Sequence, residues 1–151
     1  MDKALNITRT SRDVLSKFLD NYTLEELNKV PPGFNNNLIW NIAHIVVVQQ
    51  MLVYNLSGLP MLVSDDMVAK YKRGTKPENE VTQQEVDEIR ALLFTTIEQT
   101  QKDWENGVFK TYQEFTTLSG FRLQTAEDAT GFNYYHEAVH TGMMMSIRKF
   151  L

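Results

Sequence analysis

Three histidines have the types and spacing that could hold a single metal ion. His136 and His140 stand four residues apart in the run HEAVH, and His44 lies far upstream in NNLIWNIAHIVVV. Four residues make just over one turn of an α-helix, so the two side chains would project from the same helix face. Two imidazoles at this spacing can bind one metal ion, and a third from another helix would complete a three-histidine site.

The composition restricts which chemistry this site could perform. The 151 residues include no cysteine, which excludes disulfides, thiolate ligands and a protein thiol nucleophile. A metal would therefore be held by nitrogen and oxygen, and any reacting thiol would belong to a substrate. The net charge is −4 and the sequence has no run rich in lysine and arginine. We therefore expect no nucleic-acid partner.

The run HEAVH also matches HExxH, the helix signature of zinc peptidases. In those enzymes the third ligand usually follows the motif, but only eleven residues follow His140, and none is His, Asp or Glu. The sequence therefore favours a metal site without peptidase activity. Glu137 is a candidate for acid–base catalysis, with a solvated or ion-paired helix residue as its alternative role. Asn41 lies three residues before His44 and is a candidate to orient a ligand by a hydrogen bond.

The hydrophobic pattern predicts an all-α four-helix bundle in one domain over residues 1–151. Long helices are expected at about 3–20, 37–57, 83–105 and 125–150, with a short helix after the capping box at Thr23. The second long helix is apolar on nearly every face, so it should be covered by neighbouring helices or a second subunit. Its apolar stretch looks too short and too polar to span a membrane.

The remaining segments predict two connections and one buried helix face. Residues 58–80 form a long connection with a short helical turn near 65–71, of a length that often covers a site. Residues 108–124 predict a loose extended piece or small hairpin. In the last helix, one face carries the expected core stripe: Phe132, His136, Val139, His140, Met143 and Ile147.

This order of histidines, one in the second long helix and an HxxxH pair in the last, resembles the DinB-like (DinB/YfiT-like) family of metalloenzymes over nearly the whole chain. The segment LSGLPMLVSDDMVAKYKRGTKP is similar to a loop in one branch of the family, and HEAVHTGMMMSIRKF is similar to its closing helix. By position, His44, His136 and His140 correspond to the three metal ligands. Met143 departs from the glutamine often found there.

The resemblance implies a divalent metal, with nickel or zinc favoured over iron or manganese. It also implies activation of a small thiol for transfer to an electrophilic substrate, as in family members that use bacillithiol or mycothiol. Family members are commonly homodimers. We therefore expect a metal-dependent transferase or hydrolase acting on a small molecule.

One alternative is a non-catalytic bundle that binds a metal or ligand as a sensor or scaffold. Another is an interaction protein with vacant histidines. We expect no signal peptide, no membrane partner and a cytoplasmic location.

Overall fold

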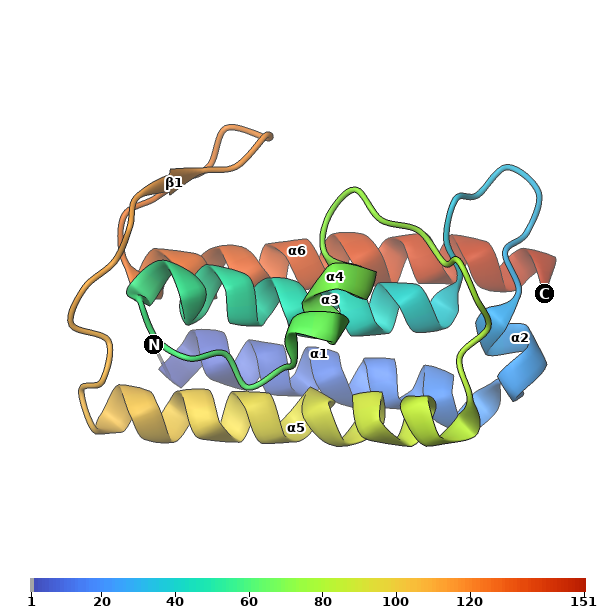
Figure 1. The fold of residues 1–151 in the computed structure, drawn as a ribbon, viewed down its shortest axis with the longest axis horizontal. Coiled ribbons are helices and arrows are strands. Elements are labelled where there is room, and N and C mark those ends of the chain that lie inside the picture. The colour runs from blue at the N-terminus through green and yellow to red at the C-terminus, as the bar shows by residue number, and fades with distance from the viewer. Residues whose placement is uncertain (1) are drawn as a thin grey trace.

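Four long helices form a bundle in the computed structural model, which describes residues 2–151 (Figure 1). The chain directions in Figure 1 show that the first and last of these helices run one way and the other two run the opposite way. The fold class predicted from the sequence is confirmed. The four helices are α1 (Asp2–Asn21), α3 (Leu38–Val53), α5 (Gln83–Glu105) and α6 (Ala126–Ile147).

The long connection between α3 and α5 follows from their shared direction, because the chain must return along the bundle before α5 can begin. This connection contains the 3₁₀ helix η1 (Asn55–Ser57) and the short helix α4 (Asp65–Tyr71), which packs across α3 (Figure 1). The Ser64 hydroxyl accepts a hydrogen bond from the Met67 amide and caps α4. The predicted helical turn is thus a complete short helix.

Polar caps begin the helices where the sequence places them. Thr23, Thr82 and Thr125 each form a reciprocal capping box, which begins α2 (Leu24–Asn28), α5 and α6 respectively. The Asn37 side chain accepts a hydrogen bond from the Trp40 amide and begins α3. Each cap satisfies backbone N–H groups that have no partner within the helix, so these residues set the helix starts.

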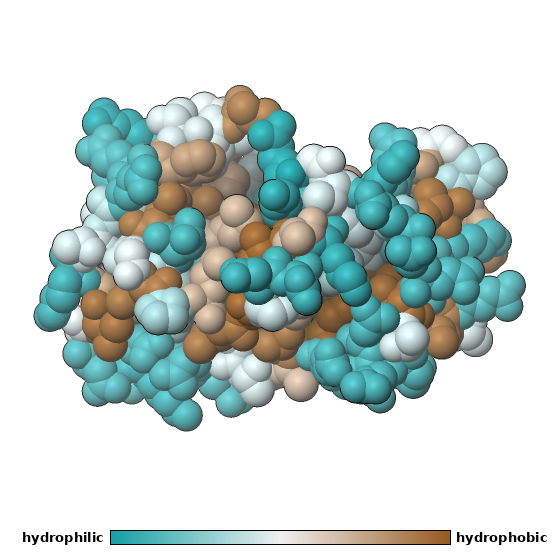
Figure 2. All heavy atoms as spheres, in the orientation of Figure 1, coloured by the Kyte–Doolittle hydropathy of each residue, from teal (hydrophilic) through white to brown (hydrophobic). Residues whose placement is uncertain are grey.

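A small hairpin stands away from the bundle between α5 and α6 (Figure 1). Its antiparallel strands are β1 (Phe115–Thr116) and β2 (Arg122–Leu123), with Phe115 opposite Leu123. This confirms the extended segment expected over residues 108–124. Hydrophobic surface lies beneath the hairpin in Figure 2. The chain ends with the 3₁₀ helix η2 (Arg148–Phe150).

The core is built around α3, in which 14 of 16 residues are buried. Helices α4, α5 and α6 pack against it, so the bundle itself covers this apolar helix. By length and composition alone, Leu38–Ser57 is long and apolar enough to cross a membrane, which corrects our prediction that this stretch is too short and too polar. However, 83% of the apolar 18-residue stretch within it is buried inside the protein.

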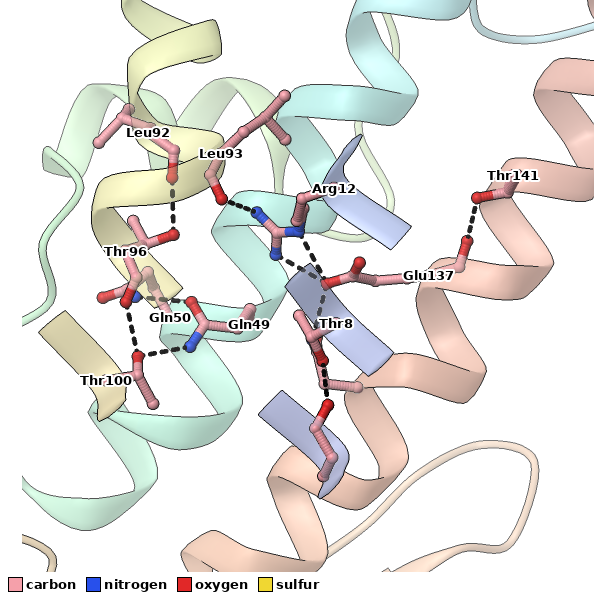
Figure 3. Close-up of polar contacts among 12 residues, drawn as sticks. Thr8, Arg12, Gln49, Gln50, Leu92, Leu93, Thr96, Thr100, Glu137 and Thr141 are labelled. Carbon is pink, nitrogen blue, oxygen red and sulfur yellow. Dashed lines mark hydrogen bonds and ion pairs between the residues drawn. The ribbon is translucent and has the colours of Figure 1, made fainter. Parts of the chain in front are cut away.

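Two adjacent glutamines in α3 are buried without disturbing this core. Gln49 donates a hydrogen bond to the Thr100 hydroxyl at 3.1 Å, and Gln50 donates to Gln49 at 2.7 Å (Figure 3). The Gln50 carbonyl oxygen accepts from the Leu62 amide at 2.8 Å. The pair therefore links α3 to α5 and to the connection that carries α4.

The buried face of α6 differs from the predicted stripe. Val139 and Met143 are 41% and 38% exposed, whereas Asn133, Glu137 and Met144 are buried. The prediction followed the apolar residues, but polar side chains also occupy the core face: Glu137 pairs with the distant Arg12, and Asn133 donates to Glu137 one turn away. His140 and Ile147 lie on the buried face as expected, and His136 is half-buried.

A buried ion pair connects Glu137 of α6 to Arg12 of α1. The Arg12 guanidinium in α1 donates to Glu137 Oε1 through Nε at 2.9 Å and Nη2 at 2.7 Å (Figure 3). Both side chains are fully buried. Arg12 also donates to the Leu93 carbonyl in α5, and Asn133 donates to Glu137 Oε1. The pair therefore joins α1, α5 and α6.

Glu137→Ala should destabilise the fold strongly, because it leaves the Arg12 charge buried without a counter-ion. We expect a loss of about 3–5 kcal/mol in the free energy of unfolding, measured by urea denaturation. The double variant Arg12→Met with Glu137→Leu should regain most of it. As a control, Asp20→Ala removes the exposed partner of Arg90 and should cost less than about 1 kcal/mol. Equal losses for Glu137→Ala and Asp20→Ala would contradict this role.

Candidate metal centre

The fold brings the three histidines together from two helices. One potential ligand atom of each lies within 4.8 Å of those of the other two. The ring centroid of His44 lies 5.2 Å from that of His136 and 4.6 Å from that of His140. The His136 and His140 rings are 4.6 Å apart. The three rings are mutually tilted, with interplanar angles of 52°, 51° and 63°, so they do not stack in parallel.

His44 is oriented by the end of α4. Its Nδ1 lies 2.6 Å from the Tyr71 carbonyl oxygen. A carbonyl can only accept a hydrogen bond, so Nδ1 carries the proton and Nε2 carries the free lone pair. Trp40 stands one turn earlier in α3 and stacks on the imidazole, with ring centroids 4.6 Å apart. The backbone of the connection and the Trp40 ring therefore fix the direction of this ligand.

His140 is oriented by Asn41. The Nδ1 atom lies 2.8 Å from Asn41 Oδ1. The Asn41 amide nitrogen donates to Asn36 Oδ1 and to the Asn37 carbonyl, which identifies the remaining amide oxygen as the acceptor. His140 therefore also carries its proton on Nδ1 and its lone pair on Nε2. A hydrogen bond of this kind holds a metal ligand in one tautomer and one orientation.

His136 makes no hydrogen bond to the described residues, and its Nδ1 is buried. Burying a polar atom without a partner costs free energy. A metal ion bound by the ring would give His136 the polar partner that the described residues do not provide. Three imidazole donors with no carboxylate among them suit a borderline divalent cation such as nickel or zinc. The residues present therefore fit a three-histidine metal site.

Burial keeps the three rings neutral. It lowers the pKa of His44, against a smaller raising effect from the Tyr71 carbonyl. Burial, together with the neighbouring histidines, lowers the pKa of His136 and of His140 to about 3. Neutral imidazole is the form that binds a metal, so at neutral pH the site is already in its binding state.

An open cavity of about 630 Å³ lies over the histidines. Its walls come from α3, α6, the hairpin residues 115–119 and the Arg73–Gly74 turn after α4. The long connection therefore borders the site. The sequence did not indicate that the hairpin forms a wall or that Trp40 supports His44. The four-residue spacing between Trp40 and His44 was the available signal for the second of these.

Glu137 and Asn41 have different places relative to the cluster. Asn41 contacts His140 directly, as described above. Glu137 is absent from the cavity walls, and its carboxylate is directed to Arg12 and Asn133. The arrangement resembles the ion-paired alternative that the sequence left open for Glu137.

The metal-free protein should lose stability as the pH falls below about 6.5. In the unfolded chain His136 and His140 have the ordinary pKa near 6.5, but in the fold it is about 3. Between these two pKa values only the unfolded chain binds the protons. The stability of the fold is therefore unaffected by these groups above pH 6.5 and decreases as the pH falls below it. We expect about 1.4 kcal/mol per pH unit for each histidine.

Urea denaturation between pH 7 and 5 measures this effect. The variant His140→Gln removes one of the two groups, so its stability should change less steeply with pH than that of the native protein. Identical slopes for the two proteins would contradict the neutral burial of His140.

Asn41→Leu should weaken metal binding by about 10- to 100-fold, because His140 loses the acceptor that orients it. Competition with a chromophoric chelator measures the affinity. Asn41→Asp keeps an acceptor oxygen and should retain tighter binding than Asn41→Leu. Asn36→Ala touches the ligand only through Asn41 and should have the smallest effect. Unchanged affinity in Asn41→Leu would show that the hydrogen bond does not position the ligand.

No curated protein matches the sequence. Residues 7–144 match the family model of the DinB superfamily. The matched range covers most of the chain and contains all three histidines. The chain belongs to the DinB superfamily.

Proposed function

We propose that the protein is a metal-dependent enzyme in which His44, His136 and His140 bind one divalent cation. The observation that carries the proposal is the convergence of three neutral imidazoles beside an open cavity large enough for a small molecule. A structural site is normally closed by four protein ligands, whereas three leave a position for a reactant. Nickel and zinc fit the donor set best.

His44, His136 and His140 would hold the cation, which would supply Lewis-acid activation of a thiol or water and so provide a nucleophile at neutral pH. The protein lacks a cysteine, so a thiol nucleophile would be a low-molecular-weight cosubstrate. Its sulfur would form a bond to an electrophilic carbon of the second substrate, whose leaving group departs with the bonding electron pair. With water in place of the thiol, the same site would catalyse hydrolysis.

The chain's own residues would orient the ligands and shape the cavity. Asn41 and the Tyr71 carbonyl hold His140 and His44 in the required tautomer. None of the described residues that line the cavity is a carboxylate. The proton released by the nucleophile would therefore pass to solvent or to the leaving group. Glu137 would stabilise the fold through Arg12 and would not transfer protons.

The experiment begins with the metal content of protein purified without a histidine tag. We expect one equivalent of a divalent metal in the native protein and none in His140→Ala after identical purification. Val139→Ala is a matched control, because this neighbouring side chain is 41% exposed and offers no ligand. Absence of metal in the native protein, or retention of it in His140→Ala, would overturn the site.

A panel of small thiols with alkylating and acyl electrophiles then tests the chemistry of the metal-loaded protein. We expect substrate consumption by the native protein and by Val139→Ala, but not by His140→Ala. Metal binding combined with ligand binding, and with no thiol transfer or hydrolysis, would favour the sensor or scaffold alternative.

A further inference from the structure

The charges that line the cavity are unbalanced. None of the described lining residues is acidic, whereas Arg73 contributes a positive charge. The histidines contribute no negative charge, because an imidazole that binds a metal is neutral. Glu137, the acid next to His136 in sequence, is already paired with Arg12. The described residues therefore place no negative charge in this cavity to balance Arg73, although the net charge of the protein is −4.

Arg73 is available for a ligand. It follows α4 in the long connection, is exposed, and makes no ion pair or side-chain hydrogen bond to the described residues. Nearby Lys70, by contrast, is paired with Glu85 at 2.8 Å. The guanidinium has several N–H donors in a planar fork that fits a carboxylate through two parallel hydrogen bonds.

The other walls are largely apolar. Trp40 and Met51 come from α3, Phe132 comes from α6, and Phe115 and Leu118 come from the hairpin. Leu118 is 79% exposed, so this apolar side chain at the cavity has room for further contact. A ligand that fills the space would bury apolar surface against these side chains, with its charged group at Arg73.

We propose that the cavity selects small molecules with an apolar body and a carboxylate, and that Arg73 binds the carboxylate. The inference rests on the proposed function for its meaning: the acid would be a substrate or cosubstrate, held at Arg73 while its reactive end reaches the histidines. Arg73 is then a specificity-determining residue. A neutral molecule of the same shape fills the apolar space but leaves the guanidinium without a partner.

The test compares hexanoate with hexan-1-ol, two probes with the same six-carbon chain, by ligand-observed NMR titration of the metal-free protein. We expect the native protein to bind hexanoate about 3- to 10-fold more tightly, as a partly exposed charge-assisted pair allows. Arg73→Gln should abolish the preference, and Arg73→Lys should keep part of it. Lys72→Gln is the matched control: it removes the same charge from an exposed neighbour that does not line the cavity.

Any of four results would overturn the inference. They are no binding of either probe, no preference in the native protein, a preference that persists in Arg73→Gln, and an equal decrease in Lys72→Gln. Metal content is measured separately on each variant. A native protein that prefers hexanoate but binds no metal would refute the proposed function and leave the carboxylate site standing. A protein that binds metal without the preference would do the reverse.

Discussion

The arrangement of the site depends on the antiparallel packing of α3 against α6, because this contact brings His44 to the HxxxH pair. Three imidazoles share a small, poorly solvated space most favourably when all are neutral, since burial disfavours one charged ring and two charged rings would also repel each other. Two of them donate their Nδ1 protons to acceptors from α3 and the end of α4. Those hydrogen bonds settle the tautomers and leave the Nε2 lone pairs free. Burial therefore keeps the rings neutral, and the two hydrogen bonds determine the orientation of His44 and His140 and leave their metal-binding nitrogens free.

The rest of the bundle holds α6 in the rotation that this packing requires. The Arg12–Glu137 pair is buried between α1 and α6, on a face adjacent to the one that carries His136. Buried ion pairs gain little net stability over apolar contacts, but they resist rearrangement because a broken pair leaves a buried charge. Gln50 similarly ties the connection to α3 through the Leu62 amide. These polar contacts link the site to elements that carry no ligand.

Local signals in the sequence located the four long helices, but the second was expected to reach about residue 57, whereas α3 ends at Val53 and the 3₁₀ helix η1 follows. The Thr82 capping box and the turn at Asn106–Gly107 predict α5 over 83–105, which is its observed extent. The histidine grouping was also anticipated: the four-residue spacing indicated the His136–His140 pair, and the resemblance to the DinB-like family implied that His44 completes the set. The buried face of α6 was not. Phe132 and Met143 look like core residues but line the cavity. Glu137 looks like a surface residue but is buried, because it pairs with Arg12. Local patterns do not reveal this pair, since the two residues are 125 positions apart in the sequence.

The cavity walls were unpredictable for a related physical reason. A hairpin and a turn contribute Phe115, Leu118 and Arg73 to one space, and no periodicity within either segment records that they meet. Their meeting results from the path of two long connections around the bundle. A sequence pattern describes which face of a helix is apolar, but it does not describe which loops converge over that face.

X-ray absorption spectroscopy of the protein loaded with one equivalent of nickel or zinc tests the central claim most directly. We expect a first shell with three imidazole nitrogens, at about 2.0–2.1 Å for zinc, and one imidazole fewer in His136→Ala. A first shell without imidazole scattering, or one that is unchanged in His136→Ala, would contradict the three-histidine metal centre.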